Sequence, residues 1–108
     1  MADQQRVESL LAVENEIYGG TGNCPHSGQS AHLFNYDLLT QSFTDLGIPV
    51  QDEPVIGGVV ATSDRVVYGG TCYNGHLFSY EPPATFTILE CLPTFGQNRL
   101  ERFDGSAP

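Results

Sequence analysis

The chain has few basic residues, no tryptophan and no long apolar run. Its 108 residues include four Lys and Arg against 13 Asp and Glu, a formal net charge of −9. Nucleic acids and anionic membranes attract clustered basic residues, so this balance argues against both as partners. No run approaches the roughly 18 apolar residues of a membrane span, and the polar opening Met1 to Arg6 lacks the apolar core of a signal peptide. We therefore expect a soluble, cytoplasmic, single-domain protein.

Cysteine is also scarce. Cys24, Cys72 and Cys91 are odd in number and have no C-x-x-C spacing. This pattern disfavours a disulfide framework and a structural zinc site. We expect reduced thiols, no metal and no cofactor.

What the chain does contain is an internal repeat. Three segments return in the same order: 17–21 (IYGGT) as 67–71 (VYGGT), 32–37 (HLFNYD) as 76–81 (HLFSYE), and 43–46 (FTDL) as 86–89 (FTIL). The offsets are 50, 44 and 43 positions. A period of this size is typical of proteins built from stacked or radially arranged repeats.

Each repeat is predicted to form four antiparallel strands, because short β-branched and aromatic runs alternate with turn residues. Glu14-Asn15 and Ser63-Asp64 suit tight hairpins, since Asn and Asp tolerate left-handed backbone geometry. The expected strands are 7–13, 16–21, 32–36 and 42–46 in the first repeat, and 58–62, 65–71, 76–80 and 85–89 in the second. The fold class is therefore all-β. The single domain 1–108 divides into units of about 6–49 and 54–93 and a tail, 94–108.

The double glycine that closes the second strand of each unit carries a family resemblance. It stands in Tyr18-Gly19-Gly20 and Tyr68-Gly69-Gly70, and each is followed by a variable loop and a strand ending in Tyr and an acidic residue. Over roughly residues 6 to 93 the chain resembles the kelch type of β-propeller repeat, with Phe43 and Phe86 where that family usually has tryptophan. The resemblance implies an architecture of four-stranded blades and no particular function. We expect the glycines to permit close packing or a bulge. A phosphate-binding loop is disfavoured, because no helix start follows them.

Two blades do not close a propeller, which generally has about four to eight. One blade face covers roughly 300 Å². If such a face stays exposed to water, up to ~8 kcal/mol of hydrophobic stabilisation is lost. We therefore predict a homo-oligomeric ring, with three copies favoured over two or four. The tail segment 98–103 resembles residues 5–10. It is expected either to pair with an edge strand of the next subunit, or to mark the chain as an excised piece of a longer propeller.

The loop between the second and third strands of the first unit is the leading candidate for a ligand site. It has ten residues (22–31), against four (72–75) in the second unit, and length variation at one place marks a surface loop. Its polar groups and those of the shorter loop suit a carbohydrate or peptide. The candidate site residues are Asn23, His26, Gln29, Tyr73 and Asn74.

Catalytic interpretations of the remaining polar residues have less support than a binding loop. Cys24 and His26 resemble a nucleophile and base, but spacing alone supplies neither alignment nor an orienting group. The repeated His32 and His76 are expected to serve the repeated fold and not a metal. The acidic stretch 51–53 is expected to be solvated linker charge, although paired carboxylates also bind calcium or act as acid and base.

The sequence therefore predicts a two-blade building block of a homo-oligomeric β-propeller that acts as a binding or scaffold module and not as an enzyme. Two alternatives stay open. One is a propeller lyase or hydrolase with its site at the central opening. The other is an engineered or fragmentary chain without a selected function.

Overall fold

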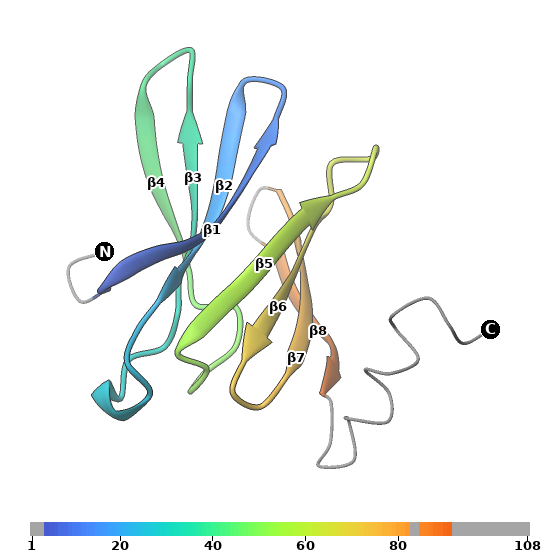
Figure 1. Ribbon diagram of the computed structural model, residues 1–108. Coiled ribbons are helices and arrows are strands. Elements are labelled where there is room, and N and C mark those ends of the chain that lie inside the picture. The colour runs from blue at the N-terminus through green and yellow to red at the C-terminus, as the bar shows by residue number, and fades with distance from the viewer. Residues whose placement is uncertain (1–3, 83–84, 92–108) are drawn as a thin grey trace.

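The computed structural model describes residues 4–82 and 85–91 (Figure 1). These residues form eight β-strands and one 3-10 turn, with no α-helix among them. The elements are β1 (Arg6–Val13), β2 (Glu16–Gly22), η1 (Pro25–Ser27), β3 (Leu33–Asp37), β4 (Ser42–Gly47), β5 (Val55–Ala61), β6 (Val67–Cys72), β7 (His76–Glu81) and β8 (Thr85–Cys91). The predicted all-β class is confirmed. The tail 94–108, with its segment 98–103, lies outside the described residues.

All eight predicted strands are present, and the largest errors lie at the start of the second unit. β5 begins at Val55 and not at residue 58, because Val55 already pairs with Cys72 of β6. β6 begins at Val67 and not at residue 65. Arg65 has a φ of 69°, and its N–H donates to the carbonyl of Thr62 at 2.9 Å, so it still belongs to the turn.

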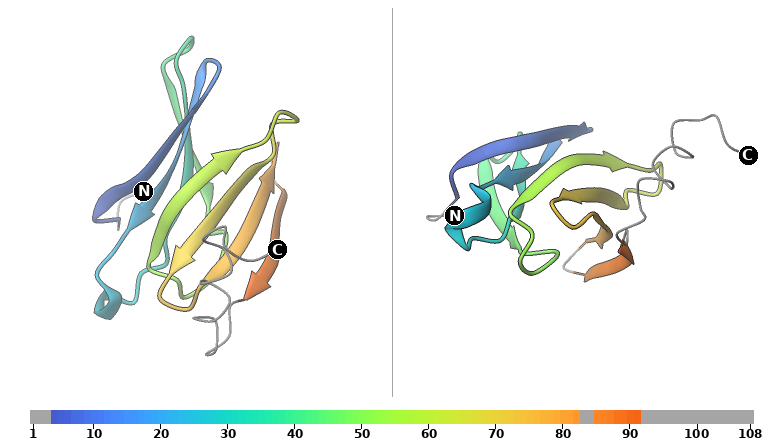
Figure 2. Two further views of the ribbon diagram at one scale, coloured as in Figure 1. Left: turned by 45° about the vertical axis from the view of Figure 1, so that its right-hand side comes forward. Right: turned by 60° about the horizontal axis from the view of Figure 1, so that its bottom comes forward.

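The strands form two consecutive four-stranded antiparallel meanders, β1–β4 and β5–β8, in one curled sheet (Figures 1 and 2). The sheet order is β4-β3-β2-β5-β6-β7-β8, and β1 pairs with β2. A single residue pair, Gly22 with Val55, joins β2 to β5. β1 and β5 lie side by side, and Ser9 Oγ donates to the carbonyl of Ile56 at 2.9 Å. The meanders are therefore nearly separate sheets that share one joint.

The two meanders repeat the same register. In β1 the pairing with β2 shifts between Val7 and Ser9, and in β5 the pairing with β6 shifts between Ile56 and Gly58. The pairing of β3 with β4 and that of β7 with β8 also shift at equivalent points, beside Phe34 and Phe78. Because the registers match, strand residues that are paired at the same point of both meanders are structural equivalents.

The hydrophobic core lies between the meanders and takes one face from each. Apolar burial of this kind is the main favourable term in folding. Of the four tyrosines that recur with the repeat, Tyr18 and Tyr80 are buried in this core, whereas Tyr36 and Tyr68 are half-buried. The buried members are Tyr18, Ala31, Leu33, Val50, Ile56, Val59, Val67, Phe78 and Tyr80.

The repeated glycines lie where a phenylalanine ring rests on the backbone. A Cβ at Gly19 would lie 2.3 Å from Cζ of Phe34, and a Cβ at Gly69 would lie 2.3 Å from Cζ of Phe78. A side chain does not fit at such distances. The phenylalanine of the third strand of each meander can therefore pack in this way only if the facing residue of the second strand is glycine. The prediction of close packing is confirmed for Gly19 and Gly69, whereas a Cβ at Gly70 would meet no atom within 4 Å.

Candidate functional site

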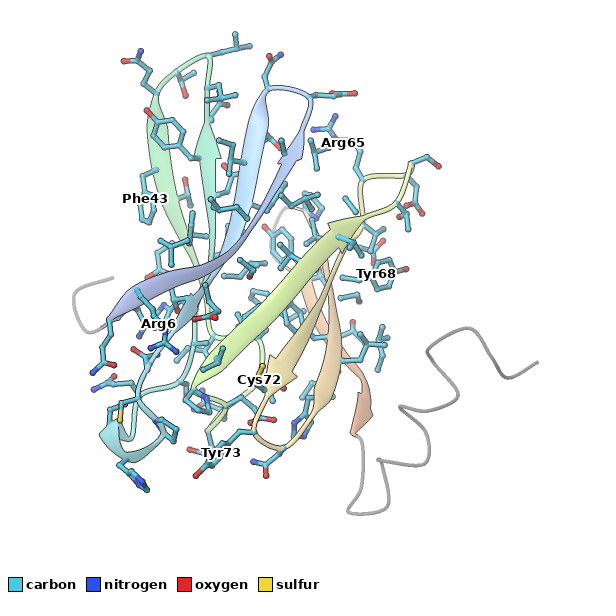
Figure 3. The ribbon with its side chains drawn as sticks, viewed as in Figure 1. Arg6, Phe43, Arg65, Tyr68, Cys72 and Tyr73 are labelled. Atoms are coloured by element: carbon cyan, nitrogen blue, oxygen red, sulfur yellow. The ribbon has the colours of Figure 1, made fainter. Side chains whose placement is uncertain are left out.

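The loops named as a candidate ligand site lie at the same end of the molecule. The loop that contains η1 and the β6–β7 turn are both at the bottom of Figure 1 and of the left view in Figure 2. His26 and Asn74 are exposed, Gln29 is half-buried, and Tyr73 is 67% exposed with a φ of 103°. These four residues present polar and aromatic groups at the surface (Figure 3 labels Tyr73).

Asn23, the fifth candidate, has a different position. Its side chain is fully buried. The amide Nδ2 donates to Gln4 Oε1 at 2.8 Å and to the carbonyl of Pro54 at 3.2 Å, while Oδ1 accepts from the N–H of Gln5 at 3.1 Å. Asn23 therefore ties the segment before β1 to the segment before β5, and its polar groups are used by the fold.

A buried carboxylate lies behind the same loops. Glu53 is 1% exposed and precedes β5. Its carboxylate contacts His76 Nδ1 at 2.5 Å and accepts from Thr71 Oγ1 at 2.9 Å and from the N–H of Asn74 at 3.1 Å. The expectation of solvated linker charge is wrong for Glu53, because three donors replace its water; Asp52 beside it is exposed. Sequence reasoning missed this role.

The first meander has a related set of contacts, in which Gln4 before β1 takes the place of Glu53 before β5 and the histidine has a different partner. Thr21, the equivalent of Thr71, donates to Gln4 Oε1 at 2.5 Å, and its Oγ1 accepts from the N–H of His32 at 2.8 Å. His32 Nδ1 contacts Asp45 Oδ1 at 2.9 Å. Burial alone would raise the pKa of Asp45, but hydrogen bonds from His32 and from the Gly47 amide hold it below its usual value. Both repeated histidines are thus occupied by contacts within the fold.

Among residues 4–82 and 85–91, no three His, Cys, Asp or Glu side chains converge as metal ligands would. Cys24 and Cys72 are free and exposed, and the side chain of Cys91 lies outside the described part. In the same described part no hydrogen bond joins Cys24 to His26; the loop is closed by the N–H of Ser27 donating to the carbonyl of Cys24 at 3.0 Å.

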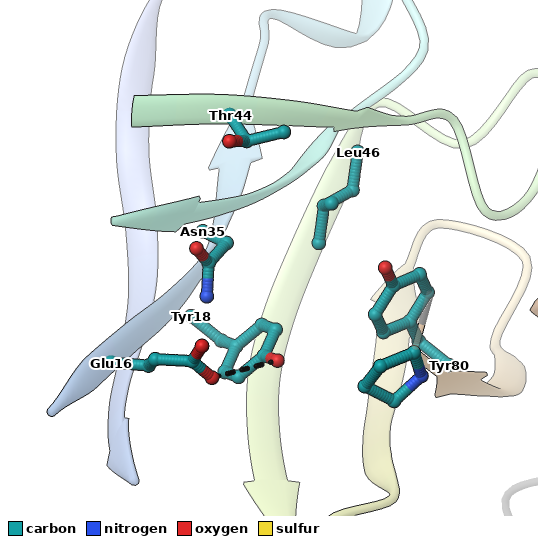
Figure 4. A pocket seen from close by; sticks show the side chains of 7 residues that line it. Glu16, Tyr18, Asn35, Thr44, Leu46 and Tyr80 are labelled. Atoms are coloured by element: carbon teal, nitrogen blue, oxygen red, sulfur yellow. Dashed lines mark hydrogen bonds between the residues drawn. The ribbon is translucent and has the colours of Figure 1, made fainter. Parts of the chain in front are cut away.

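A polar and aromatic cleft opens where the two meanders diverge (Figure 4). Its volume is about 190 Å³. Tyr18 OH donates to Glu16 Oε1 at 3.2 Å inside it. Arg65 of the second meander contacts Glu14 and Glu16 at the outer end and bridges the two hairpins. The other lining residues are Asn35, Thr44, Leu46, Tyr80 and Pro82. Sequence patterns contain no direct signal for this cleft, because its tyrosines recur with the repeat as core residues do.

The environment of Tyr18 predicts a loss of stability in alkali. Burial, with the Glu16 carboxylate as a second cause, raises the pKa of Tyr18 to about 12, whereas a tyrosine in an unfolded chain titrates near 10. A raised folded-state pKa stabilises the fold fully below about pH 10 and loses that contribution as pH rises through 12. We expect a loss of about 2 kcal/mol over this range. Urea unfolding at pH 9 and pH 12 measures it, and an equal loss in Tyr18→Phe would contradict the assignment.

Each meander has one covered face and one uncovered face, and the two uncovered faces are different. On the first meander the uncovered face, here called the leading face, carries Val7, Leu10 and Phe43. On the second meander it carries Val60, Tyr68 and Leu77 and is called the trailing face. Figure 3 shows Phe43 and Tyr68 on opposite sides of the molecule.

The trailing face is hollowed. Val60, Tyr68, Leu77 and the glycines Gly58, Gly69 and Gly70 line a shallow depression of about 270 Å³. A Cβ at Gly58 or at Gly70 would meet no atom within 4 Å. This open apolar surface is the second site that sequence reasoning did not locate by residue, although it did predict that each two-blade chain leaves faces uncovered.

Among the described residues, no helix has the length and apolarity needed to cross a membrane. Comparison of the chain with protein-family models, with curated proteins and with solved structures gives no match, so the kelch-type resemblance stays a prediction from the sequence.

Proposed function

We propose that this chain is a two-blade building block of a homo-oligomeric β-propeller and acts as a scaffold or ligand-binding module. Three copies, which would give six blades, are the favoured ring. Two four-stranded meanders with one register and a single joining residue pair support the assignment of each meander as a blade.

The observation that carries the proposal is the opposite burial of equivalent residues. Leu33 is fully buried in the first meander, whereas its equivalent Leu77 is 43% exposed. Leu10 is 63% exposed in the first meander, whereas its equivalent Val59 is 8% exposed. The face that is buried in one meander is therefore exposed in the other. A further copy of the chain could pack against each exposed face as the two meanders pack against each other.

The energetic argument agrees with this geometry. Removing apolar surface from water stabilises a protein by about 25 cal/mol per Å². Contiguous exposed apolar patches of several hundred Å² on soluble monomers generally mark interaction sites. The leading face exposes Val7, Leu10 and Phe43, and the trailing face exposes Val60 and Leu77. Covering both faces by self-association is therefore the arrangement that completes the core.

We infer a non-catalytic role because the titratable groups with the most contacts support the fold. Glu53 bonds Thr71, Asn74 and His76, and Asp45 holds His32. A general base must come within hydrogen-bond reach of the proton that it abstracts, and Glu53 is only 1% exposed. Binding is proposed instead at the exposed loop residues or in the tyrosine-lined cleft, with a carbohydrate or a peptide as ligand.

The mass of the protein in solution tests the assembly. We expect light scattering to give about 35 kDa for three copies of the 11.7 kDa chain. A closed assembly of two or four copies would retain the function and replace the favoured copy number. A mass of one chain at every concentration up to the millimolar range would end the proposal.

A glycan and peptide screen tests the ligand-binding role. We expect His26→Ala with Tyr73→Ala to weaken any hit at the loops about tenfold or more, because stacking on an aromatic ring and a hydrogen bond are lost together. Asn35→Ala is the matched variant for the cleft. Affinity unchanged in both variants would discard both sites.

A further inference from the structure

We propose that copies of this chain join head to tail, with Val7 on the leading face of one copy seated over Gly70 on the trailing face of the next. This inference rests on the proposed self-association and specifies which faces meet and in what register. The partner is a second copy of the chain, because the contact between its own two meanders already supplies the pattern.

The internal contact is built around Gly20 of the first meander. Ile56 of the second meander is fully buried and lies on Gly20, where a Cβ would come within 2.4 Å of Ile56 Cγ2. Gly20 accepts this side chain because it has none of its own. The first meander therefore offers a glycine socket that an apolar residue of the next meander fills.

The second meander offers the same socket empty. Gly70 is the equivalent of Gly20, since they pair with Gly58 and Ser9 at equivalent points of the register, and its surroundings are open. The equivalent of Ile56 is Val7, because Ile56 pairs with Thr71 and Val7 with Thr21. Val7 is 55% exposed on the leading face. A second copy placed by the relation that links the two meanders brings Val7 over Gly70.

Neighbouring residues extend the same correspondence. Val59 packs into the core between the meanders, and its equivalent Leu10 is exposed. Leu11 packs against that core from the other side, and its equivalent Val60 is exposed. Inside one chain, Val59 and Ile56 of the second meander face Leu11 and Gly20 of the first. Between copies, the equivalent residues Leu10 and Val7 on the leading face would face Val60 and Gly70 on the trailing face.

One hydrogen bond of the internal contact has no counterpart between copies. Ser9 Oγ donates to the carbonyl of Ile56 at 2.9 Å, but the equivalent of Ser9 in the second meander is Gly58. Gly58→Ser would place a hydroxyl opposite the carbonyl of Val7 of the next copy, in open space. Gly58→Ser would reproduce the internal hydrogen bond between two copies, so we expect it to strengthen their contact.

Because the leading and trailing faces differ, the contact is heterologous and each face can be blocked separately. Gly70→Val fills the socket, and Leu10→Glu places a charge on the opposite face. Leu39→Glu is the matched control, since Leu39 is exposed in the β3–β4 turn, away from both faces. We expect each blocked variant to keep the circular dichroism of the wild type and to have the mass of one chain. Leu39→Glu should assemble as the wild type does.

Mixing the two blocked variants is the decisive experiment. Each retains the face that the other lacks, so an equimolar mixture should form a complex of two chains, followed by NMR titration of one labelled variant into the other. Gly58→Ser should lower the dissociation constant of wild-type self-association about 3- to 10-fold, the range for one added hydrogen bond.

The outcomes separate this inference from the function on which it rests. A monomeric wild type overturns the proposed function. A wild type that assembles, together with blocked variants that assemble equally well or a mixture that stays monomeric, overturns the head-to-tail register alone. If Gly70→Val does not fold, Leu10→Glu and Gly58→Ser decide, and an unchanged dissociation constant in both overturns the inference.

Discussion

Leu33→Ala is expected to lower the free energy of unfolding by about 2–5 kcal/mol, the range for large-to-small changes at fully buried leucines. Leu33 has no exposed surface and lies in the core between the meanders. Removing its side chain leaves a cavity between two sheets that are joined by one residue pair, Gly22 with Val55. Urea unfolding followed by circular dichroism in dilute protein measures the change.

Leu77→Ala is the matched comparison, because the register makes Leu77 the equivalent of Leu33. Its side chain is 43% exposed on the trailing face. In dilute protein we expect this variant to unfold within about 1 kcal/mol of the wild type, since partly exposed positions tolerate truncation. At high concentration it should self-associate more weakly. Equal destabilisation by the two substitutions in dilute protein would contradict the one-sided burial described here.

Glu53→Ala is expected to destabilise the fold by about 3–5 kcal/mol, because the three groups bonded to this buried carboxylate lose their partner, at a cost of about 1–3 kcal/mol for each unsatisfied group. Thr71, His76 and the N–H of Asn74 would all lose their acceptor. Because the cluster holds the β6–β7 turn against the segment before β5, local opening should follow. Hydrogen exchange at the amide of Asn74 is expected to accelerate together with the loss of global stability.

Two variants control for this interpretation. Asp52→Ala removes a neighbouring acid that is exposed, and we expect a change below about 0.5 kcal/mol. Glu53→Gln retains the size and one acceptor oxygen, so its cost should be intermediate, about 1–3 kcal/mol. If Glu53→Ala proves no more harmful than Asp52→Ala, the carboxylate is not a structural element.

Local sequence chemistry predicted the strands well. The hairpin turns occur where they were predicted, but the residues with left-handed geometry are Glu14 (φ 55°) and Arg65 (φ 69°) and not the expected Asn15 and Asp64. All eight strands occur at or near their expected positions. The errors at β5 and β6 have a tertiary and a local cause. Val55 joins the sheet because β2 and β6 both pair with it, whereas Arg65 continues the turn through its bond to Thr62.

The candidate site was harder to predict. His26 and Tyr73 are exposed as expected, but Asn23 and Glu53 are buried by contacts with Gln4 and His76, which are distant in the sequence. Composition marks such residues as polar and therefore as surface groups. Only the approach of the loops at one end of the sheets supplies the donors and acceptors that replace water.

The sequence alone determined the repeat, the order of the strands, the turns and the glycines that let phenylalanine rest on the backbone. These features depend on neighbours within a few positions or within one meander, so two similar segments produce two similar structures. Tertiary structure decided which of two equivalent residues is covered: Leu33 and not Leu77, Ile56 and not Val7. The physical reason is that a side chain is buried only where a second surface packs against it. Within one chain, each meander has the other meander on one side only.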